Sequence, residues 1–181
     1  MPRFDHSTQM ASVALSESAR AASAAEARFR IDDPNSRPRA IKVIALDRPS
    51  ERVMKQLAQS PWTSATFLTA IASMPRRGER FSMQGWLSDL TGHTKDLVDE
   101  IDSADLVVMV ATAGEDAQVA SIIGEACSLK RVMTTALVLR TASISDEALS
   151  QSLAQLRPWA LMLVIATAEE YIGDMLAALR A

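Results

Sequence analysis

The sequence has few cysteines, histidines and glycines, and each shortage argues against a class of site. Cys127 is the single cysteine among 181 residues, so no disulfide forms within the chain. That thiol and the two histidines, His6 and His93, argue against a zinc site built from thiolate and imidazole ligands. The six glycines form no Walker-type Gly-Lys-Ser/Thr motif, no dinucleotide-binding triplet and no nucleophile elbow.

Long apolar runs and an excess of basic charge are also missing. No stretch approaches the roughly 18 to 20 apolar residues that span a bilayer, and the N-terminus lacks the apolar block of a secretory signal. A formal charge of −3 gives no general attraction to nucleic acid or to anionic membranes. We therefore expect a cytoplasmic protein without a membrane partner. Nucleic-acid binding through Arg76, Arg77 and Arg80 is an alternative, which so few phosphate contacts support poorly.

Residues 1–38 differ in composition from the rest of the chain. They are rich in Ala and Ser, and residues 32–38 hold prolines and Asx residues, which favour turns. We expect a flexible leader and linker over residues 1–38. The alternative is an Ala-rich helix over residues 13–30 that docks on another subunit. Residues 39–181 are predicted to form a single α/β domain, and a hydrophobic fraction of 48% is enough for its core.

Residues 104–140 predict the centre of the fold. An apolar run at residues 106–110 is followed by a turn at residues 112–116, an amphipathic segment and a second apolar run at residues 132–139. The amphipathic segment places a set of apolar residues on one side of a helix: Val119, Ile122, Ile123, Ala126 and Leu129. This pattern is typical of two parallel strands joined by a helix, because parallel strands are covered on both faces and read as continuous apolar runs.

Further strands are predicted on both sides of this unit, at residues 41–46, 65–71 and 159–166. With the central pair they make five strands that alternate with helices. Such alternation implies a three-layer, Rossmann-like α/β sandwich with a mainly parallel sheet of about five strands and helices on both faces.

The helices are predicted from caps and spacing. One opens at residues 47–50 with a proline in its first turn, and another is expected over residues 90–101, with His93 at the surface. Ser143 and Asp146 are spaced like a helix cap. A closing helix is expected to bury Tyr171, Ile172, Met175, Leu176 and Leu179. Residues 74–85 are predicted to be a long loop whose arginines form a solvated surface or, alternatively, an anion site.

Candidate ligand residues lie in the turns after the first and third strands, because ligands of open parallel sheets gather beyond the carboxyl ends of the strands. There Arg48 and Ser50 would hold a phosphate, and Asp116 would hold a metal or polarise a water. The competing interpretation is that Glu115 and Asp116 stabilise the start of the following helix. Cys127 is expected to be a buried, inert thiol. The candidate set is Asp47, Arg48, Ser50, Thr112, Gly114, Glu115 and Asp116.

Taken in order, the elements over residues 41–168 resemble the nucleotide-binding half of the tubulin-like cell-division GTPases of the FtsZ type. Residues 41–44 resemble the first strand of that family. Residues 104–107 and 112–114 resemble the approach to its phosphate-binding signature loop. The resemblance implies a tubulin-like scaffold with a site for GTP or another nucleotide, with magnesium, at the loops after the first and third strands.

The departures from that family fall on the residues that would grip phosphate. Where the family has a glycine-rich first loop, this chain has residues 47–50, and Gly114 runs directly into Glu115 and Asp116. The family's long central helix and second domain have no expected counterpart after the fifth strand. A retained scaffold and a lost GTPase are implied, because a fold does not carry a function whose site residues are absent. We therefore expect no catalytic residue and no cofactor.

The sequence thus predicts a non-catalytic accessory or oligomerisation domain that acts through protein contacts, with a protein partner or further copies of itself. Trp62, Trp86 and Trp159 are candidate interface anchors, since aromatic residues are enriched at interfaces, and core packing is the alternative for each. The rival prediction is a degenerate GTPase-like protein that binds a nucleotide or another phosphorylated ligand at the two turns.

Overall fold

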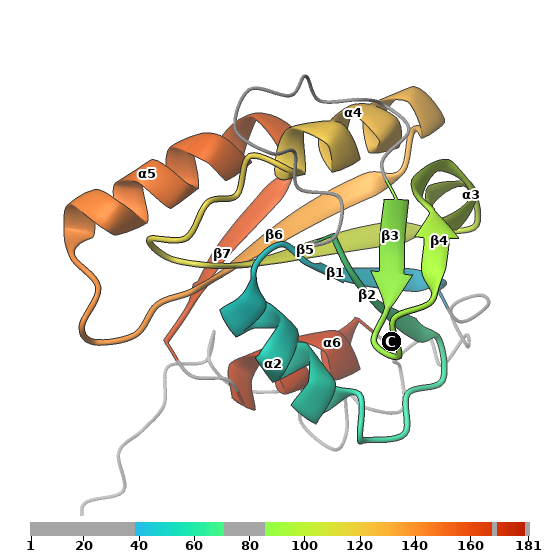
Figure 1. The fold of residues 1–181 in the computed structure, drawn as a ribbon, viewed down its shortest axis with the longest axis horizontal. Coiled ribbons are helices and arrows are strands. Elements are labelled where there is room, and N and C mark those ends of the chain that lie inside the picture. Colours follow the sequence, from blue (N-terminus) through green and yellow to red (C-terminus); the bar gives the residue numbers. More distant parts are fainter. Residues whose placement is uncertain (1–38, 71–85, 168–169, 180–181) are drawn as a thin grey trace, which may run out of the picture. The chain divides into compact units, whose positions relative to one another are not determined.

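The computed structural model describes residues 39–70, 86–167 and 170–179 (Figure 1). The predicted leader over residues 1–38 and the arginine-bearing loop over residues 74–85 lie outside these residues. Within the described part, no helix is long and apolar enough to cross a membrane.

The described strands form one mainly parallel sheet. Their bounds are β1 (Ile41–Ala45), β2 (Ala65–Thr69), β3 (Trp86–Asp89), β4 (Thr94–Asp96), β5 (Leu106–Thr112), β6 (Met133–Leu139) and β7 (Met162–Ala166). The order across the sheet is β4-β3-β2-β1-β5-β6-β7. The five neighbouring strands β2, β1, β5, β6 and β7 are parallel to one another. Strand β3 pairs antiparallel with β2, and β4 pairs antiparallel with β3, so this hairpin extends the sheet beyond β2. All the predicted strands are therefore confirmed, and a hairpin is added to them.

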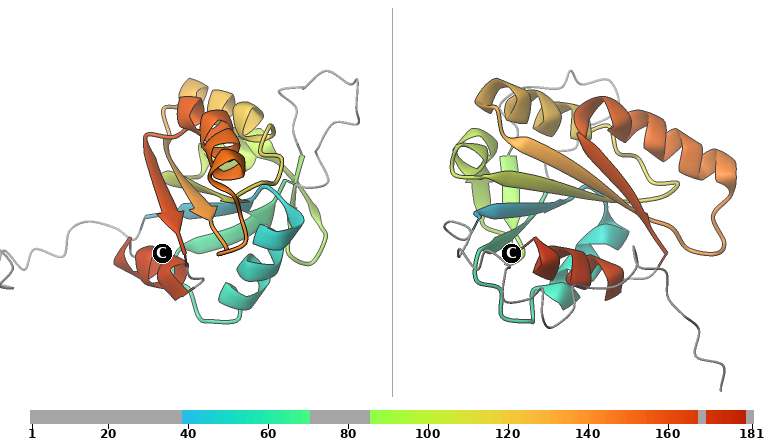
Figure 2. Two further views of the ribbon diagram at one scale, coloured as in Figure 1. Left: turned by 90° about the vertical axis from the view of Figure 1, so that its left-hand side faces the viewer. Right: turned by 180° about the vertical axis from the view of Figure 1, so that it is seen from behind.

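Helices lie on both sides of this sheet (Figures 1 and 2). They are α2 (Arg48–Leu57), α3 (Leu97–Asp102), α4 (Ala120–Lys130), α5 (Asp146–Leu156) and α6 (Glu170–Ala178), with a 3-10 turn, η3 (Arg157–Trp159), between α5 and β7. Figure 2 shows α4 and α5 above the sheet and α2 and α6 below it. The buried residues accordingly divide into two clusters, one on each face of the sheet. The chain is an α/β protein, as its alternating pattern predicts.

The helix predicted over residues 90–101 is wrong in its first half. Residues 86–96 instead form the β3–β4 hairpin, and α3 begins only at Leu97. The turn is held by Asp89, whose Oδ1 accepts hydrogen bonds from the backbone N–H groups of Thr91 and His93, each at 2.9 Å. Gly92 has a φ of 94°, a conformation that a side chain would strain. These local bonds compete with helix formation and win.

Three smaller expectations also fail. Leu129 and Tyr171 are 69% and 50% exposed, so neither belongs to the buried face of its helix. The N-cap of α5 is Ser145 instead of Ser143, because the Ser145 side chain accepts the hydrogen bond from the Ala148 N–H. Ile172 and Leu176 are fully buried, as expected, whereas Met175 and Leu179 are only partly buried against the same core.

Two of the tryptophans serve the core more than a surface. Trp62 is half-buried, donates its indole N–H to the Leu57 carbonyl at 2.7 Å and meets Phe67 edge to face. Trp159 is half-buried and packs against α4 beside Gly124. The side chain of Trp86 lies outside the described residues.

Candidate functional site

The carboxyl ends of β1 and β5 meet where the chain connections diverge to opposite sides of the sheet, the usual place for a ligand in this fold class. Asp47 occupies that place and is only 5% exposed. Its Oδ1 accepts hydrogen bonds from the Ser50 N–H at 2.7 Å and the Thr112 hydroxyl at 2.9 Å, and its Oδ2 accepts one from the Thr112 N–H at 2.6 Å. The carboxylate therefore ties the start of α2 to the end of β5.

Ser50 completes this arrangement from the helix side. Its Oγ accepts the Asp47 N–H at 3.2 Å and donates to the Asp47 carbonyl at 2.9 Å, which makes a capping box at the start of α2. Ser50 is fully buried. A phosphate held by Ser50, as the sequence suggests for a ligand site, would have to displace the cap of the helix.

Two backbone N–H groups of the turn after β5 donate hydrogen bonds to side chains of α5. The Gly114 N–H donates to Ser152 Oγ at 2.9 Å, and the Ala117 N–H donates to Gln155 Oε1 at 2.8 Å. Phosphate-binding turns leave successive N–H groups free to point at the anion. Here the N–H groups of Gly114, Glu115 and Ala117 are bonded within the protein itself.

Glu115 and Asp116 are exposed and do not stabilise the start of α4, so that expectation is wrong. The helix begins at Ala120, its N-cap Val119 makes no side-chain capping bond, and its first turn contains no acid. Asp116 instead accepts the Gln118 N–H at 3.0 Å within the turn. Among the described residues, no cluster of three or more His, Cys, Asp or Glu side chains is arranged to hold a metal.

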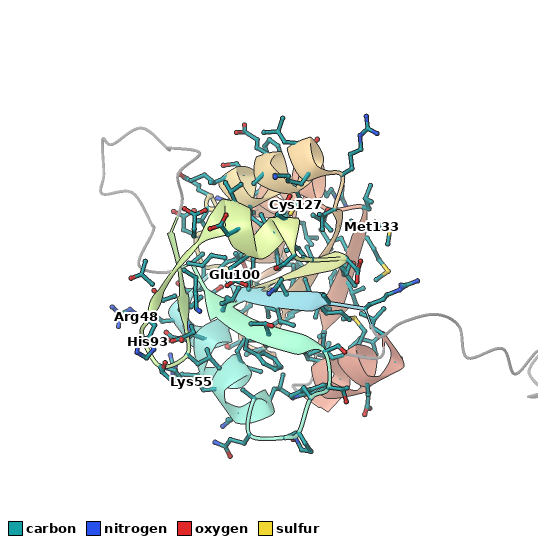
Figure 3. All side chains as sticks on the ribbon, turned by 90° about the vertical axis from the view of Figure 1, so that its right-hand side faces the viewer. Arg48, Lys55, His93, Glu100, Cys127 and Met133 are labelled. Atoms are coloured by element: carbon teal, nitrogen blue, oxygen red, sulfur yellow. The ribbon has the colours of Figure 1, made fainter. Side chains whose placement is uncertain are left out.

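The candidate residues named from the sequence thus fall into separate groups. Asp47, Ser50 and Thr112 bond one another, whereas Gly114 is bonded to α5. Arg48 is exposed and extends away from the fold (Figure 3). Cys127 is buried, and burial raises the pKa of its thiol to about 12, in agreement with an inert residue.

A hollow that the sequence does not reveal lies between α2 and the carboxyl ends of β5, β6 and β7. Its volume is about 470 Å³. Its polar lining consists of arginine, glutamine and threonine side chains: Arg52, Gln56, Thr112, Arg140, Thr141 and Thr167. Neither arginine belongs to a motif, and they come from elements far apart in the chain, so only the fold brings them to one place.

A second feature is the edge strand β7. In the described part of the chain β7 pairs with β6 alone, so one row of its backbone groups has no strand partner. Its apolar side chains are unusually open to solvent, with Met162 at 45%, Ile165 at 43% and the preceding Leu161 at 79% exposure. Met133 of β6, at 47% exposure, points outward at the same margin of the sheet (Figure 3).

The backbone of β7 shows which groups face outward. The Ala166 carbonyl accepts the Arg140 N–H, at 2.8 Å, from the segment that follows β6. Backbone groups of alternate residues point to the same side of a strand. The N–H and C=O groups of Leu163 and Ile165 therefore face away from β6.

Comparison with known proteins gives no relative from which a function could be taken. No protein-family model matches the chain, and no curated protein matches it.

Proposed function

We propose that the chain is a non-catalytic α/β domain that acts through protein contacts and associates with a second copy of itself along β7. The observation that carries this proposal is the edge itself, which combines backbone groups that pair with no other described strand with exposed Leu161, Met162 and Ile165. Natural edge strands are normally protected by charge, proline, a bulge or a cover. The sequence of β7, Met-Leu-Val-Ile-Ala, has no charge and no proline.

A second copy is the occupant that suits this edge best. Two β7 strands related by a two-fold axis would run antiparallel, and the outward N–H and C=O groups of Leu163 and Ile165 would pair with those of the other copy. Because β7 carries no charge, the approach of two identical strands meets no like-charge repulsion. The exposed apolar side chains of β7 would be covered at the same time.

The interior of the fold supports a structural role over a catalytic one. We take the framework to be a three-layer, Rossmann-like sandwich of the tubulin-like kind, cytoplasmic in location. In that framework the place for a ligand at the ends of β1 and β5 is filled by Asp47 and its partners Ser50 and Thr112. The donors of Ser50 and Thr112 are therefore bonded to Asp47 and are not available to a phosphate.

Sedimentation velocity over a range of concentrations tests the self-association. The wild-type chain is expected to show a dimer, and Ile165→Lys is expected to weaken the dimer at least about a hundredfold, since a lysine on an edge strand opposes pairing. The matched control is Val98→Lys, which places the same charge at another exposed apolar residue, on α3 (Val98 is 39% exposed). Val98→Lys should sediment as the same dimer as the wild-type chain.

A monomeric wild-type chain at all concentrations would contradict self-association. An equal loss of dimer in Ile165→Lys and Val98→Lys would place the interface elsewhere. A dimer that is lost when residues 1–38 are removed would mean that the leader, and not a second β7, binds the edge strand.

The rival function is nucleotide binding with magnesium at the turns of Asp47 and Gly114. It requires Asp116 to hold the metal, so Asp116→Asn should abolish magnesium-dependent binding of GTP or ATP if this function exists. Thermal unfolding with each nucleotide measures it, because a ligand at one hundred times its Kd stabilises the fold by about 2.7 kcal/mol. We expect no magnesium-dependent stabilisation, because the N–H groups of Ser50, Gly114 and Ala117 in the two turns are already bonded within the protein.

A further inference from the structure

The hollow bounded by α2 and the ends of β5, β6 and β7 has a one-sided charge. Two arginines, Arg52 and Arg140, line it, and among the described residues no carboxylate belongs to its lining, although Asp146 pairs with Arg140. The whole chain is acidic, with a formal charge of −3, so a basic hollow is not a reflection of overall composition. Positive charge in a concave site concentrates anions there.

The two arginines retain donors for a ligand. Arg140 donates from Nη2 to Asp146 Oδ1 at 2.7 Å, which holds the guanidinium in place and leaves its other N–H groups available. In the described part of the chain Arg52 makes no ion pair. A guanidinium binds phosphate and carboxylate groups through two parallel N–H donors.

The rest of the lining suits the body of a small molecule. Val53, Leu139 and Ala166 add apolar side chains to the lining of the hollow, and Thr141 and Thr167 add hydroxyl-bearing ones. A volume of about 470 Å³ lies within the range of about 300 to 1,000 Å³ of small-molecule sites. The position, beyond the carboxyl ends of three parallel strands, is where such folds bind ligands.

From this juxtaposition we propose that the hollow binds a small organic anion, with its phosphate or carboxylate group on Arg52 and Arg140 and its apolar body against Val53, Leu139 and Ala166. This site borders the turns of Asp47 and Gly114, since Pro49 and Thr112 also line it, but it places the anion on Arg52 and Arg140 and needs no metal. It is also independent of self-association through β7, because β7 contributes to it only the end of the strand, at Ala166.

Titration of the full chain with three aromatic probes tests the proposal. Phenyl phosphate and benzoate carry the two candidate anionic groups, and benzyl alcohol is the uncharged counterpart. Chemical shifts in a ¹⁵N–¹H spectrum at low salt report where each probe binds. At least one anion is expected to bind with a Kd of about 1 mM or below and to shift the amides of Val53, Thr141 and Thr167. Benzyl alcohol is expected to bind at least about tenfold more weakly.

The matched variants lie one turn apart on α2. Arg52→Gln removes a lining arginine, whereas Arg48→Gln removes an exposed arginine that does not line the hollow. Arg52→Gln should weaken anion binding at least about tenfold, and Arg48→Gln by less than about twofold. Arg140→Gln is a second test, with the dispersion of the spectrum showing that the variant is folded.

Whichever anion binds more tightly identifies the chemical group that the hollow recognises. The proposal is overturned if neither anion binds saturably, if benzyl alcohol binds as tightly as the anions, or if the two arginine variants on α2 lose affinity equally. The last result would mean that anions respond to the charge of the whole surface and not to this hollow.

Discussion

The two edges of the described sheet, β4 and β7, have equally unpaired backbones and opposite side chains. β4 is three residues long, Thr-Lys-Asp, with both charges on the strand itself. β7 is five residues long, apolar throughout and partly exposed. Charged, short edge strands resist pairing with other chains, and long apolar ones favour it. The comparison teaches that the backbone leaves both edges open and that the side chains close only one of them.

The two edges also differ in how they are attached. β4 leads directly into α3 through Asp96, which caps the helix by accepting the Val98 N–H at 2.8 Å. β7 is entered from η3, whose Trp159 carbonyl accepts the Thr134 hydroxyl at 2.7 Å. Substitutions at these two attachments should therefore disturb one edge and spare the other.

The largest effect is expected at the entry to β7. A Cβ added at Gly124 would lie 2.5 Å from the Cβ of Trp159, closer than real contacts allow. Gly124→Ala should therefore force η3 away from α4 and destabilise the fold by about 3 kcal/mol, as overpacked cores do. Urea unfolding measures the loss, and the dimer should weaken with it because the start of β7 moves.

Gly173→Ala is the matched control for that substitution. Gly173 lies inside α6, and its added Cβ would meet only Leu57 Cδ2, at 3.4 Å. Alanine is favoured over glycine in a helix by up to about 1 kcal/mol, so this variant should be as stable as wild type or slightly more so. Equal destabilisation by the two variants would contradict the role given to Trp159.

The next effect is expected on the β4 side, at the ion pair that holds α3 to the sheet. Lys42 Nζ lies 2.6 Å from Glu100 Oε2, and the two side chains are 12% and 17% exposed. Glu100→Ala would leave Lys42 charged and largely buried, at a cost of about 2 to 3 kcal/mol in the free energy of unfolding.

Replacing both partners tests whether the loss of stability comes from the unpaired charge. The double variant Lys42→Met, Glu100→Met removes both charges. Its free energy of unfolding should lie within about 1 kcal/mol of the wild-type value, since apolar replacements of buried pairs are often neutral. A double variant no more stable than Glu100→Ala would show that the charges themselves are required. Neither variant should change the dimer at β7.

A pH effect is expected at the turn of the β3–β4 hairpin. The hydrogen bond from the Thr91 hydroxyl, followed by that from the His93 N–H, holds the pKa of Asp89 well below its usual range. A lowered pKa means that the stabilising effect of the carboxylate is present above its unfolded pKa of about 3.9 and is lost only as pH falls through the lower folded value.

The amide shifts of Thr91 and His93 should therefore remain native as the pH is lowered from about 6 to about 3, a pH at which an ordinary aspartate would already be mostly protonated. If these native shifts were lost with a midpoint at about pH 4, the hydrogen bonds would not lower the pKa of Asp89. Asp89→Asn should show weaker hairpin bonds at every pH.

The smallest effect is expected when the charge of the closed edge is removed. Lys95→Val takes one charge from β4, and exposed substitutions of this kind change stability by less than about 0.5 kcal/mol. The variant should show weak additional association at high concentration, which sedimentation velocity detects. Association as strong as that through β7 would mean that length contributes nothing to the difference between the edges.

The sequence predicts the parallel strands and the helices well, because continuous apolar runs and capped amphipathic segments leave little choice. It fails at residues 90–96, where Leu90, Leu97 and Ile101 fit a helical spacing until the bonds of Asp89 are known. The apolar run of β7 is read correctly as a strand, but its place at an edge of the sheet depends on strand order, which one sequence does not reveal.

The site is less predictable than the fold. Asp47 is readable as a helix cap, but its bonds to Thr112 depend on the pairing of β1 with β5. No local sequence pattern predicts that Arg52 and Arg140 line one hollow. They meet because β5, β6 and β7 pair side by side and α2 lies next to their carboxyl ends. Residues that meet only through strand order carry no signal in one sequence.

Amide hydrogen exchange along the two edge strands tests the central claim most directly. If β7 pairs with a second copy, the amides of Leu163 and Ile165 should become more protected as the protein concentration rises, while those of β4 stay unprotected at every concentration. Protection of Leu163 and Ile165 that is low and independent of concentration would contradict the proposal that this edge joins two copies of the chain.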